Sequence, residues 1–166
     1  MLRIAGIIRE SIVDGPGLRF VVFTQGCPHH CKGCHNPQTH DPNGGYEIDV
    51  ERILDEFYKN PLLQGITISG GEPFLQAREL IPLLKAIKKG SEHFPFFVRD
   101  VTIYTGYTIS CLKSMNDPAV DEVLSYCDIL IDGPYIEAER DLTLTFRGSR
   151  NQNIIYLNKE KGEEEL

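Results

Sequence analysis

The chain has 166 residues, with 17 lysines and arginines against 24 aspartates and glutamates, and a net charge of −7. This length predicts one domain that is large enough to bury a hydrophobic core. The acidic balance argues against nucleic acid or an acidic membrane surface as a partner, because both require a basic face. No apolar run approaches the about 20 residues of a membrane-spanning helix, and the first ten residues do not follow the pattern of a signal peptide. The sequence therefore predicts a cytoplasmic protein.

The first half of the chain predicts two strands with a helix between them. Residues 19–25 (RFVVFTQ) and 65–69 (GITIS) are short runs rich in β-branched and aromatic residues, which are typical of buried strands. Between them, an apolar stripe at helical spacing begins directly after Asp49, the expected N-cap. The members of this stripe are Val50, Ile53, Leu54 and Phe57.

The second half continues the alternation. A second helical stripe consists of Leu80, Leu83, Leu84 and Ile87. Gly90 is expected to end that helix in a left-handed conformation. Strands are predicted at 101–105, 128–131 and 153–157, and a third helix is predicted to begin at Asp117 as its cap with Pro118 in the first turn.

This alternation of strands and helices predicts an α/β fold with a parallel sheet covered on both faces. A complete eightfold βα barrel takes about 250 residues, so this chain has room for roughly half of the units. We therefore expect an open, partial βα barrel over residues 1–157, followed by a disordered acidic tail at 158–166. The chemistry of such a sheet lies at the carboxyl ends of its strands.

Three of the five cysteines fall in one segment directly after the first predicted inner strand. Cys27, Cys31 and Cys34 have the spacing C-x3-C-x2-C. Three thiolates leave one iron of a four-iron cluster without a protein ligand, which gives the open position that a reactive centre needs. Cys111 and Cys127 lie far from this segment and are expected to be small buried side chains. Zinc is the alternative metal, with a fourth ligand from His29, His30, His35 or His40.

The second motif, SGGEP at residues 69–73, follows the second predicted strand. Gly70 and Gly71 allow a ligand to approach the backbone closely, and Glu72 offers an acceptor for an ammonium group. Taken alone, the motif also fits an ordinary strand-to-helix turn. Because both motifs lie at one rim of the sheet, together they predict a site for a ligand that carries an amine.

The combination of C-x3-C-x2-C with GGEP after the next strand resembles the radical S-adenosylmethionine superfamily. The resemblance implies a [4Fe-4S] cluster on the three cysteines, with the amino and carboxylate groups of S-adenosylmethionine at the fourth iron and residues 70–72 at the amino group. One electron then breaks the sulfonium C–S bond and gives methionine and a 5'-deoxyadenosyl radical. The resemblance implies no catalytic side chain beyond the cluster ligands.

The segment around the last cysteine departs from the pattern of the superfamily. Many members have an aromatic residue just before this cysteine, near the adenine, whereas this chain has Gly33. The resemblance places Gly33, Cys34 and His35 at S-adenosylmethionine, and His35 is expected to take over the contact to the adenine.

Further segments narrow the family. Residues 14–19 (DGPGLR) and 34–37 (CHNP) resemble enzymes that install glycyl radicals. Residues 104–107 (YTGY), 132–135 (DGPY) and 146–152 (FRGSRNQ) resemble the activating proteins of anaerobic ribonucleoside-triphosphate reductase. The resemblance implies an oxidoreductase that forms a glycyl radical on this large reductase and receives its electron from a flavodoxin- or ferredoxin-type donor.

Several alternatives stay open at this level. Asp132 fits either a helix cap or a ribose contact, and Arg147 and Arg150 fit either surface charges or contacts to the partner or the methionine carboxylate. His29 and His30 are expected in an exposed loop. The alternative functions are activation of another glycyl-radical enzyme such as pyruvate formate-lyase, a small-molecule radical enzyme such as a carboxy-deazaguanine synthase, and a zinc-binding module without catalysis.

Overall fold

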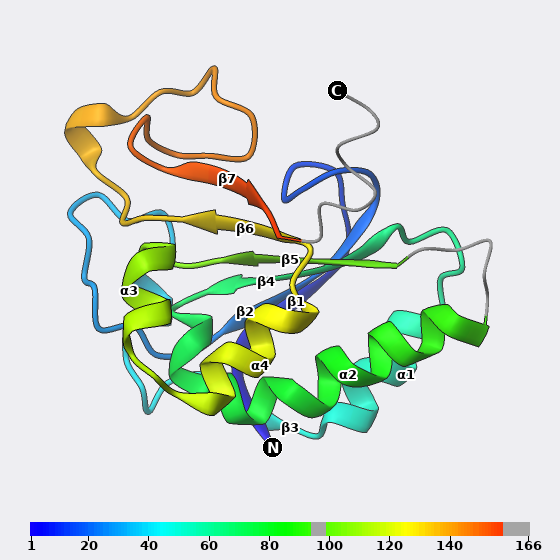
Figure 1. Cartoon of the computed structure of the whole chain (residues 1–166). Coiled ribbons are helices and arrows are strands. Elements are labelled where there is room, and N and C mark those ends of the chain that lie inside the picture. The colour runs from blue at the N-terminus through cyan, green and yellow to red at the C-terminus, as the bar shows by residue number, and fades with distance from the viewer. Residues whose placement is uncertain (94–98, 158–166) are drawn as a thin grey trace.

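The computed structural model describes residues 1–93 and 99–157, which form one seven-stranded sheet of order β3-β1-β2-β4-β5-β6-β7 (Figure 1). The parallel centre consists of β2 (Arg19–Thr24), β4 (Gly65–Gly70), β5 (Asp100–Tyr104) and β6 (Ile129–Asp132). Antiparallel strands flank this centre: β1 (Leu2–Ser11), β3 (Tyr46–Ile48) and β7 (Asn153–Tyr156). The sheet does not close on itself, since β3 and β7 are its two edges.

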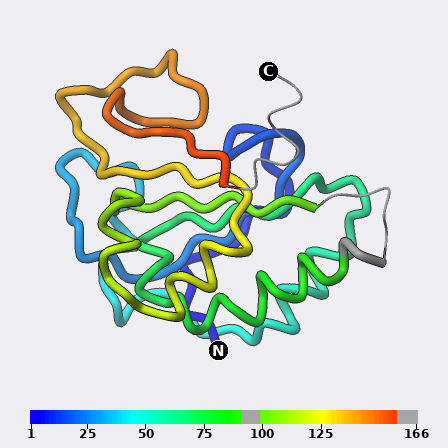
Figure 2. Tube along the Cα trace, in the orientation of Figure 1, coloured from blue at the N-terminus to red at the C-terminus, as the bar shows by residue number. Residues whose placement is uncertain are grey.

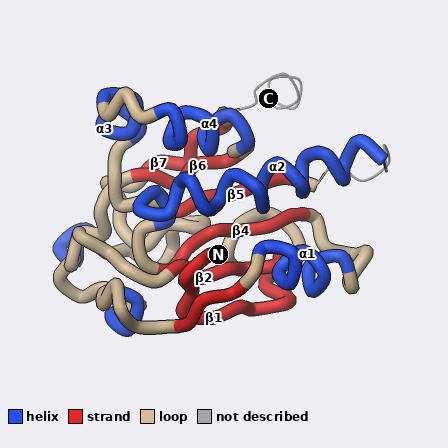
Figure 3. Tube along the Cα trace, turned by 90° about the horizontal axis from the view of Figure 1, so that it is seen from below, coloured by secondary structure: helices blue, strands red, loops and turns tan. Residues whose placement is uncertain are grey.

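Three helices cover one face of this sheet, as seen from below in Figure 3. They are α1 (Val50–Tyr58), α2 (Ala77–His93) and α4 (Pro118–Tyr126). The shorter helix α3 (Ile109–Ser114) lies near the carboxyl ends of the strands (Figure 1). Three single 3₁₀ turns complete the described elements: η1 (Pro37–Thr39), η2 (Pro73–Gln76) and η3 (Glu137–Glu139). Among the helices of the described ranges, none combines the length and apolarity that crossing a bilayer requires.

The hydrophobic core lies between these helices and the sheet. Alternate residues of the central strands point to the helices, so Phe20 and Val22 of β2 and Ile68 of β4 are fully buried there. The predicted helical stripes supply the other side of the core. Phe57 of α1, for example, packs edge-on against Phe20 with ring centroids 5.8 Å apart.

The opposite face of the sheet is organised around a fully buried arginine, Arg19. Its Nε donates to Thr67 Oγ1 at 2.7 Å, and its Nη1 donates to the Pro16 carbonyl at 2.9 Å. Its Nη2 donates to the Ile66 carbonyl at 2.8 Å and lies 2.5 Å from Asp100 Oδ1. Arg19 therefore joins the β1–β2 loop to the amino ends of β4 and β5.

An open α/β sheet with a parallel centre confirms the predicted partial barrel, but its coverage and its edges differ from expectation. Helices cover one face rather than both. The strand expected at 153–157 forms as β7, yet it is an antiparallel edge strand instead of an inner parallel one. Residues 133–152 contain no crossover helix, so the chain can only return antiparallel to β6. The strands β1 and β3 and the helix α3 are additions that the sequence analysis does not predict.

Two helix-end predictions also need correction. Gly90 does not end its helix, because α2 continues to His93. A Cβ at Gly90 would lie 2.4 Å from the Tyr58 hydroxyl, so this glycine allows α1 and α2 to pack closely. Asp49 stands at the N-cap of α1 but makes no side-chain cap hydrogen bond, whereas Asp117 caps α4 by accepting from Ala119 N–H.

The two isolated cysteines behave differently. Cys127 is fully buried, as predicted, but Cys111 is exposed. The prediction for Cys111 is wrong because α3 is short and buries only Leu112. The tail predicted at 158–166 lies outside the described residues.

Replacing Arg19 with methionine should lower the free energy of unfolding by about 3 kcal/mol, because it removes the buried cation that pairs with Asp100 and donates to the buried Ile66 carbonyl. Urea unfolding followed by circular dichroism measures this change. The matched control is Arg9→Met, which removes an ion pair to Glu56 from an arginine side chain that is 70% exposed and should cost less than about 1 kcal/mol. Equal losses in the two variants would contradict the role given to Arg19.

Candidate functional site

The loop that follows β2, residues 26–40 (the cluster loop), is closed by hydrogen bonds between its own ends. The Gly26 N–H donates to the Thr39 carbonyl at 2.7 Å, and the Cys27 N–H donates to the His40 carbonyl at 3.2 Å. These bonds hold the first predicted ligand next to the end of the loop. Backbone hydrogen bonds thus fix the two ends of the loop relative to each other.

The thiols of Cys27, Cys31 and Cys34 are free, partly buried and line one hollow. Burial raises the pKa of the Cys27 thiol above its ordinary value. The Asn36 N–H donates to Cys34 Sγ at 3.5 Å, a contact that stabilises a thiolate. Within residues 1–93 and 99–157, no three histidine, cysteine or acidic side chains are placed to hold a single metal ion. Three thiols around one hollow fit an iron-sulfur cluster, in which each iron takes its own sulfur ligand.

Gly70 and Gly71 bring the end of β4 against the end of β2. A Cβ at Gly71 would lie 2.2 Å from the Gly26 carbonyl oxygen. Gly70 has φ +99°, and a Cβ there would lie 2.5 Å from backbone atoms of Thr24. The Gly71 N–H donates to the Thr24 carbonyl, and the Glu72 N–H to the Gly26 carbonyl, both at 2.8 Å. Both glycines line the hollow, so the motif is more than an ordinary turn: it fastens the cluster loop to β4.

The Glu72 side chain is fully buried and does not line the hollow. The sequence argument places this carboxylate at the amine of a ligand, whereas in the structure it accepts hydrogen bonds from three segments of the protein. The donors are His29 Nε2 (2.7 Å), Thr105 Oγ1 (2.8 Å), Gly106 N–H (2.8 Å) and Phe74 N–H (3.1 Å). Glu72 therefore joins the cluster loop to η2 and to the end of β5.

The hollow has a volume of about 390 Å³, within the range of small-molecule sites. Five segments form its wall: the cluster loop, the end of β4, the end of β5, the β1–β2 loop at Val13 and Asp14, and the β6–β7 loop of residues 133–152. Figure 2 shows the two last loops, blue and orange, on the side of the sheet that the helices leave uncovered. Segments far apart in the sequence thus border one site.

The four histidines near the cysteines have different surroundings. His30 is exposed, as predicted, with φ 46°, and its ring packs 4.9 Å from that of His40. His29 is partly buried against the Glu72 carboxylate, so the prediction of an exposed loop is wrong for this residue. His35 is exposed and packs against Tyr135, with ring centroids 5.0 Å apart.

Two comparisons describe the domain. Residues 13–155 match the family model of a 4Fe-4S single cluster domain. Among solved structures, the crystal structure of QueE from Escherichia coli is similar with a TM-score of 0.47 and 18% sequence identity, over 64% of this chain and 53% of that chain.

Curated relatives decide the family. The anaerobic ribonucleoside-triphosphate reductase-activating protein of Pasteurella multocida is 37% identical over 88% of this chain and 91% of its own length. Proteins of the same name from Vibrio cholerae and from Enterobacteria phage T4 are each 34% identical, over 87% of this chain and 91% and 87% of their own lengths. The chain belongs to the family of anaerobic ribonucleoside-triphosphate reductase-activating proteins.

The FRGSRNQ segment, residues 146–152, folds the β6–β7 loop. Gln152 Oε1 accepts from the N–H groups of Gly148 (2.8 Å) and Ser149 (3.1 Å), and Gln152 Nε2 donates to the Gly133 carbonyl at 3.1 Å. Ser149 is fully buried within the loop. The most family-specific segment thus gives the loop its shape and sets one wall of the hollow.

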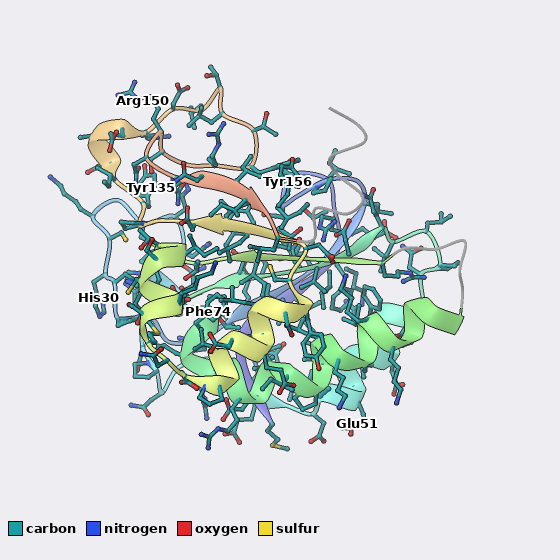
Figure 4. All side chains as sticks on the ribbon, viewed as in Figure 1. His30, Glu51, Phe74, Tyr135, Arg150 and Tyr156 are labelled. Carbon is teal, nitrogen blue, oxygen red and sulfur yellow. The ribbon has the colours of Figure 1, made fainter. Side chains whose placement is uncertain are left out.

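The charged residues whose roles the sequence leaves open are now placed. Asp132 Oδ2 accepts from the Ile109 N–H at 2.9 Å, at the start of α3, although the N-cap of that helix is Thr108. Arg147 borders the hollow, whereas Arg150 is exposed on the β6–β7 loop (Figure 4).

Gly33 has a structural reason for departing from the superfamily pattern. It has φ +75°, and a Cβ there would lie 2.9 Å from the Glu137 carboxyl carbon. The Glu137 side chain is half exposed and can move away, so the left-handed backbone conformation is what favours glycine over an aromatic residue here. Tyr135, which the sequence analysis quotes without a role, borders the hollow beside His35.

The sequence analysis also misses the donors to Glu72. Thr105 and Gly106 stand inside the YTGY segment, at the end of the strand predicted at 101–105. The rule that parallel strands place their carboxyl ends at one rim could have found them, since β5 pairs with β4. That their acceptor is Glu72 depends on side-chain directions that spacing does not encode.

Gly71→Ala should reduce the iron bound after anaerobic reconstitution and lower the free energy of unfolding by about 1–3 kcal/mol, because the added methyl group collides with the Gly26 carbonyl. Iron analysis, visible absorption and urea unfolding measure these effects. The control is Gly6→Ala, since a Cβ at Gly6 has no neighbour within 4 Å. Normal iron content in the Gly71 variant would refute the fastening role of this contact.

Proposed function

We propose that this chain activates anaerobic ribonucleoside-triphosphate reductase by forming a glycyl radical on it, with a [4Fe-4S] cluster and S-adenosylmethionine in the hollow. The observation that carries the proposal is that three free thiols and the backbone of two adjacent glycines line the same hollow. Identity of 31–37% to curated reductase-activating proteins over nearly the whole chain supports the choice of partner.

In this proposal, Cys27, Cys31 and Cys34 hold three irons and leave the fourth for the amino and carboxylate groups of S-adenosylmethionine. When bound, the cluster supplies the electron that breaks the sulfonium C–S bond and so yields methionine and the 5'-deoxyadenosyl radical that takes a hydrogen atom from the reductase. The chain itself holds the reactants and excludes water, with no side chain needed as acid or base.

The contacts to S-adenosylmethionine come from two sides of the hollow. On one side, Gly70 and Gly71 present backbone groups, and Glu72 acts through the segments that it joins rather than through an accessible oxygen. On the other side, Cys34, His35 and Tyr135 line the hollow and would hold the nucleoside, with the His35 and Tyr135 rings at the adenine, whereas Gly33 lies next to this wall without lining the hollow.

A reduced flavodoxin- or ferredoxin-type protein is the proposed electron donor, and the cytoplasm is the proposed location. A reducing compartment keeps the thiols of the cluster loop from forming disulfides and so available as ligands. The iron-sulfur family model favours a cluster over the zinc alternative. The curated relatives favour the reductase over pyruvate formate-lyase and over a small-molecule substrate.

Replacing any one of Cys27, Cys31 or Cys34 with alanine should lower the formation of 5'-deoxyadenosine from S-adenosylmethionine by more than about a hundredfold. Loss of a group that only hydrogen-bonds to a metal ligand already costs about 10–100-fold, and loss of the ligand itself should cost more. The assay uses the dithionite-reduced, reconstituted protein and chromatography of the nucleoside. Cys111→Ala is the matched control, because this thiol is exposed on α3 and does not line the hollow. Equal loss in the control would overturn the ligand assignment.

The choice of partner is tested by electron paramagnetic resonance. Incubation of the reduced wild-type protein and S-adenosylmethionine with the reductase should give a glycyl radical signal, whereas pyruvate formate-lyase should give none. A signal with pyruvate formate-lyase and none with the reductase would show that the proposed partner is wrong.

A further inference from the structure

The sheet has an exposed apolar margin on both sides of its opening. Large apolar side chains exposed on this margin are Ile8, Ile12, Val13, Leu142 and Tyr156. Val13 and Leu142 line the hollow itself, from the β1–β2 and β6–β7 loops, whereas Ile8, Ile12 and Tyr156 do not line it. What distinguishes them from scattered exposed side chains is that two of the five border the hollow.

The strand register places two of these residues at the ends of one row. Ile8 pairs with Val21, and the pairing continues through the residues of β4, β5 and β6 to Tyr156 on β7. The connecting positions are Thr67, Thr102 and Ile129. Because Ile7 packs into the core under the helices, Ile8 and the rest of this row point to the face that bears the hollow.

Exposure changes along this row. Val21, Thr67 and Thr102 in its middle are fully buried, whereas Ile8 is 43% and Tyr156 is 53% exposed at its ends. Figure 4 shows Tyr156 at β7, on the side of the sheet away from the helices. The row therefore ends in apolar side chains at both margins of the open barrel.

Both margins also have strand edges whose backbone N–H and C=O groups are not paired with a further described strand. β3 pairs with β1 only at Leu2–Ile4, so the described part of the chain leaves the outer edge of β1 beyond Ile4 without a partner strand. On the other margin, β7 pairs only with β6 among the described residues. Unpaired strand edges accept an additional extended segment through main-chain hydrogen bonds.

We infer that this apolar margin, formed by Ile8, Ile12, Val13, Leu142 and Tyr156, is the docking surface for an extended segment of the reductase. The segment has its glycine at the hollow and apolar side chains on either side of that glycine. The inference rests on the proposed function, which requires a backbone glycine of the partner to reach the hollow. A glycine exposes its Cα without a side chain in the way, while its apolar neighbours bury the exposed margin.

Ile12→Ser and Tyr156→Ser test this surface, because neither residue lines the hollow. Each variant should weaken binding to the purified large subunit of the reductase by roughly tenfold or more, because the interface then no longer buries a large apolar side chain. Binding is measured by calorimetry with the reconstituted protein, and the yield of glycyl radical at limiting reductase should fall in parallel. Formation of 5'-deoxyadenosine without the reductase should equal that of wild type.

The matched control is Leu62→Ser, which removes a leucine that is 74% exposed, comparable to the 75% of Ile12, at a position that does not line the hollow. If Ile12→Ser and Tyr156→Ser bind the reductase as tightly as Leu62→Ser does, the docking surface is refuted while the proposed function stands. If wild type forms 5'-deoxyadenosine but no radical on the reductase, the proposed function itself fails. Circular dichroism of each variant confirms that the fold is retained.

Discussion

The buried carboxylate of Glu72 is the constraint on which the rest of the site depends. A charged group without access to water is tolerated only when donors surround it. Here the donors come from the cluster loop, from η2 and from the end of β5. The fold must therefore bring these three segments together, and in doing so it places the cysteine thiols beside the two glycines at the end of β4.

The same logic operates at the other end of the strands. Arg19 is as deeply buried as Glu72 and holds the β1–β2 loop against β4 and β5. Arg19 lies on the face of the sheet that no helix covers and Glu72 at the carboxyl ends of the strands, whereas the opposite face is apolar and packs on α1, α2 and α4. The helix-covered face of the sheet thus supplies most of the hydrophobic core, and the other face carries the buried polar contacts of Arg19. These contacts hold the loops in place although the barrel is incomplete.

Sequence periodicity predicts the parallel centre, the three long helices and the common rim of the two motifs, because these features depend on local patterns and on the strand-end rule. It does not predict the direction of β7, which follows from the absence of a crossover helix after β6. Nor does it place the Glu72 side chain. The residue type suggests a carboxylate that binds a ligand amine, whereas in the structure the carboxylate accepts hydrogen bonds from the protein. That choice depends on Thr105 and Gly106, more than thirty residues away in the chain.

The motifs also differ in what they do. Those shared with the wider superfamily, C-x3-C-x2-C and GGEP, bring the three cysteines and two glycines that line one side of the hollow. The family-specific segments act mainly through the backbone: YTGY supplies donors to Glu72, and Gln152 in FRGSRNQ folds the β6–β7 loop into a wall. The loop that Gln152 shapes also carries the exposed Leu142 to the margin of the hollow. These segments thus shape the wall and the margin of the hollow. In the proposed function, this is the side at which the reductase would approach.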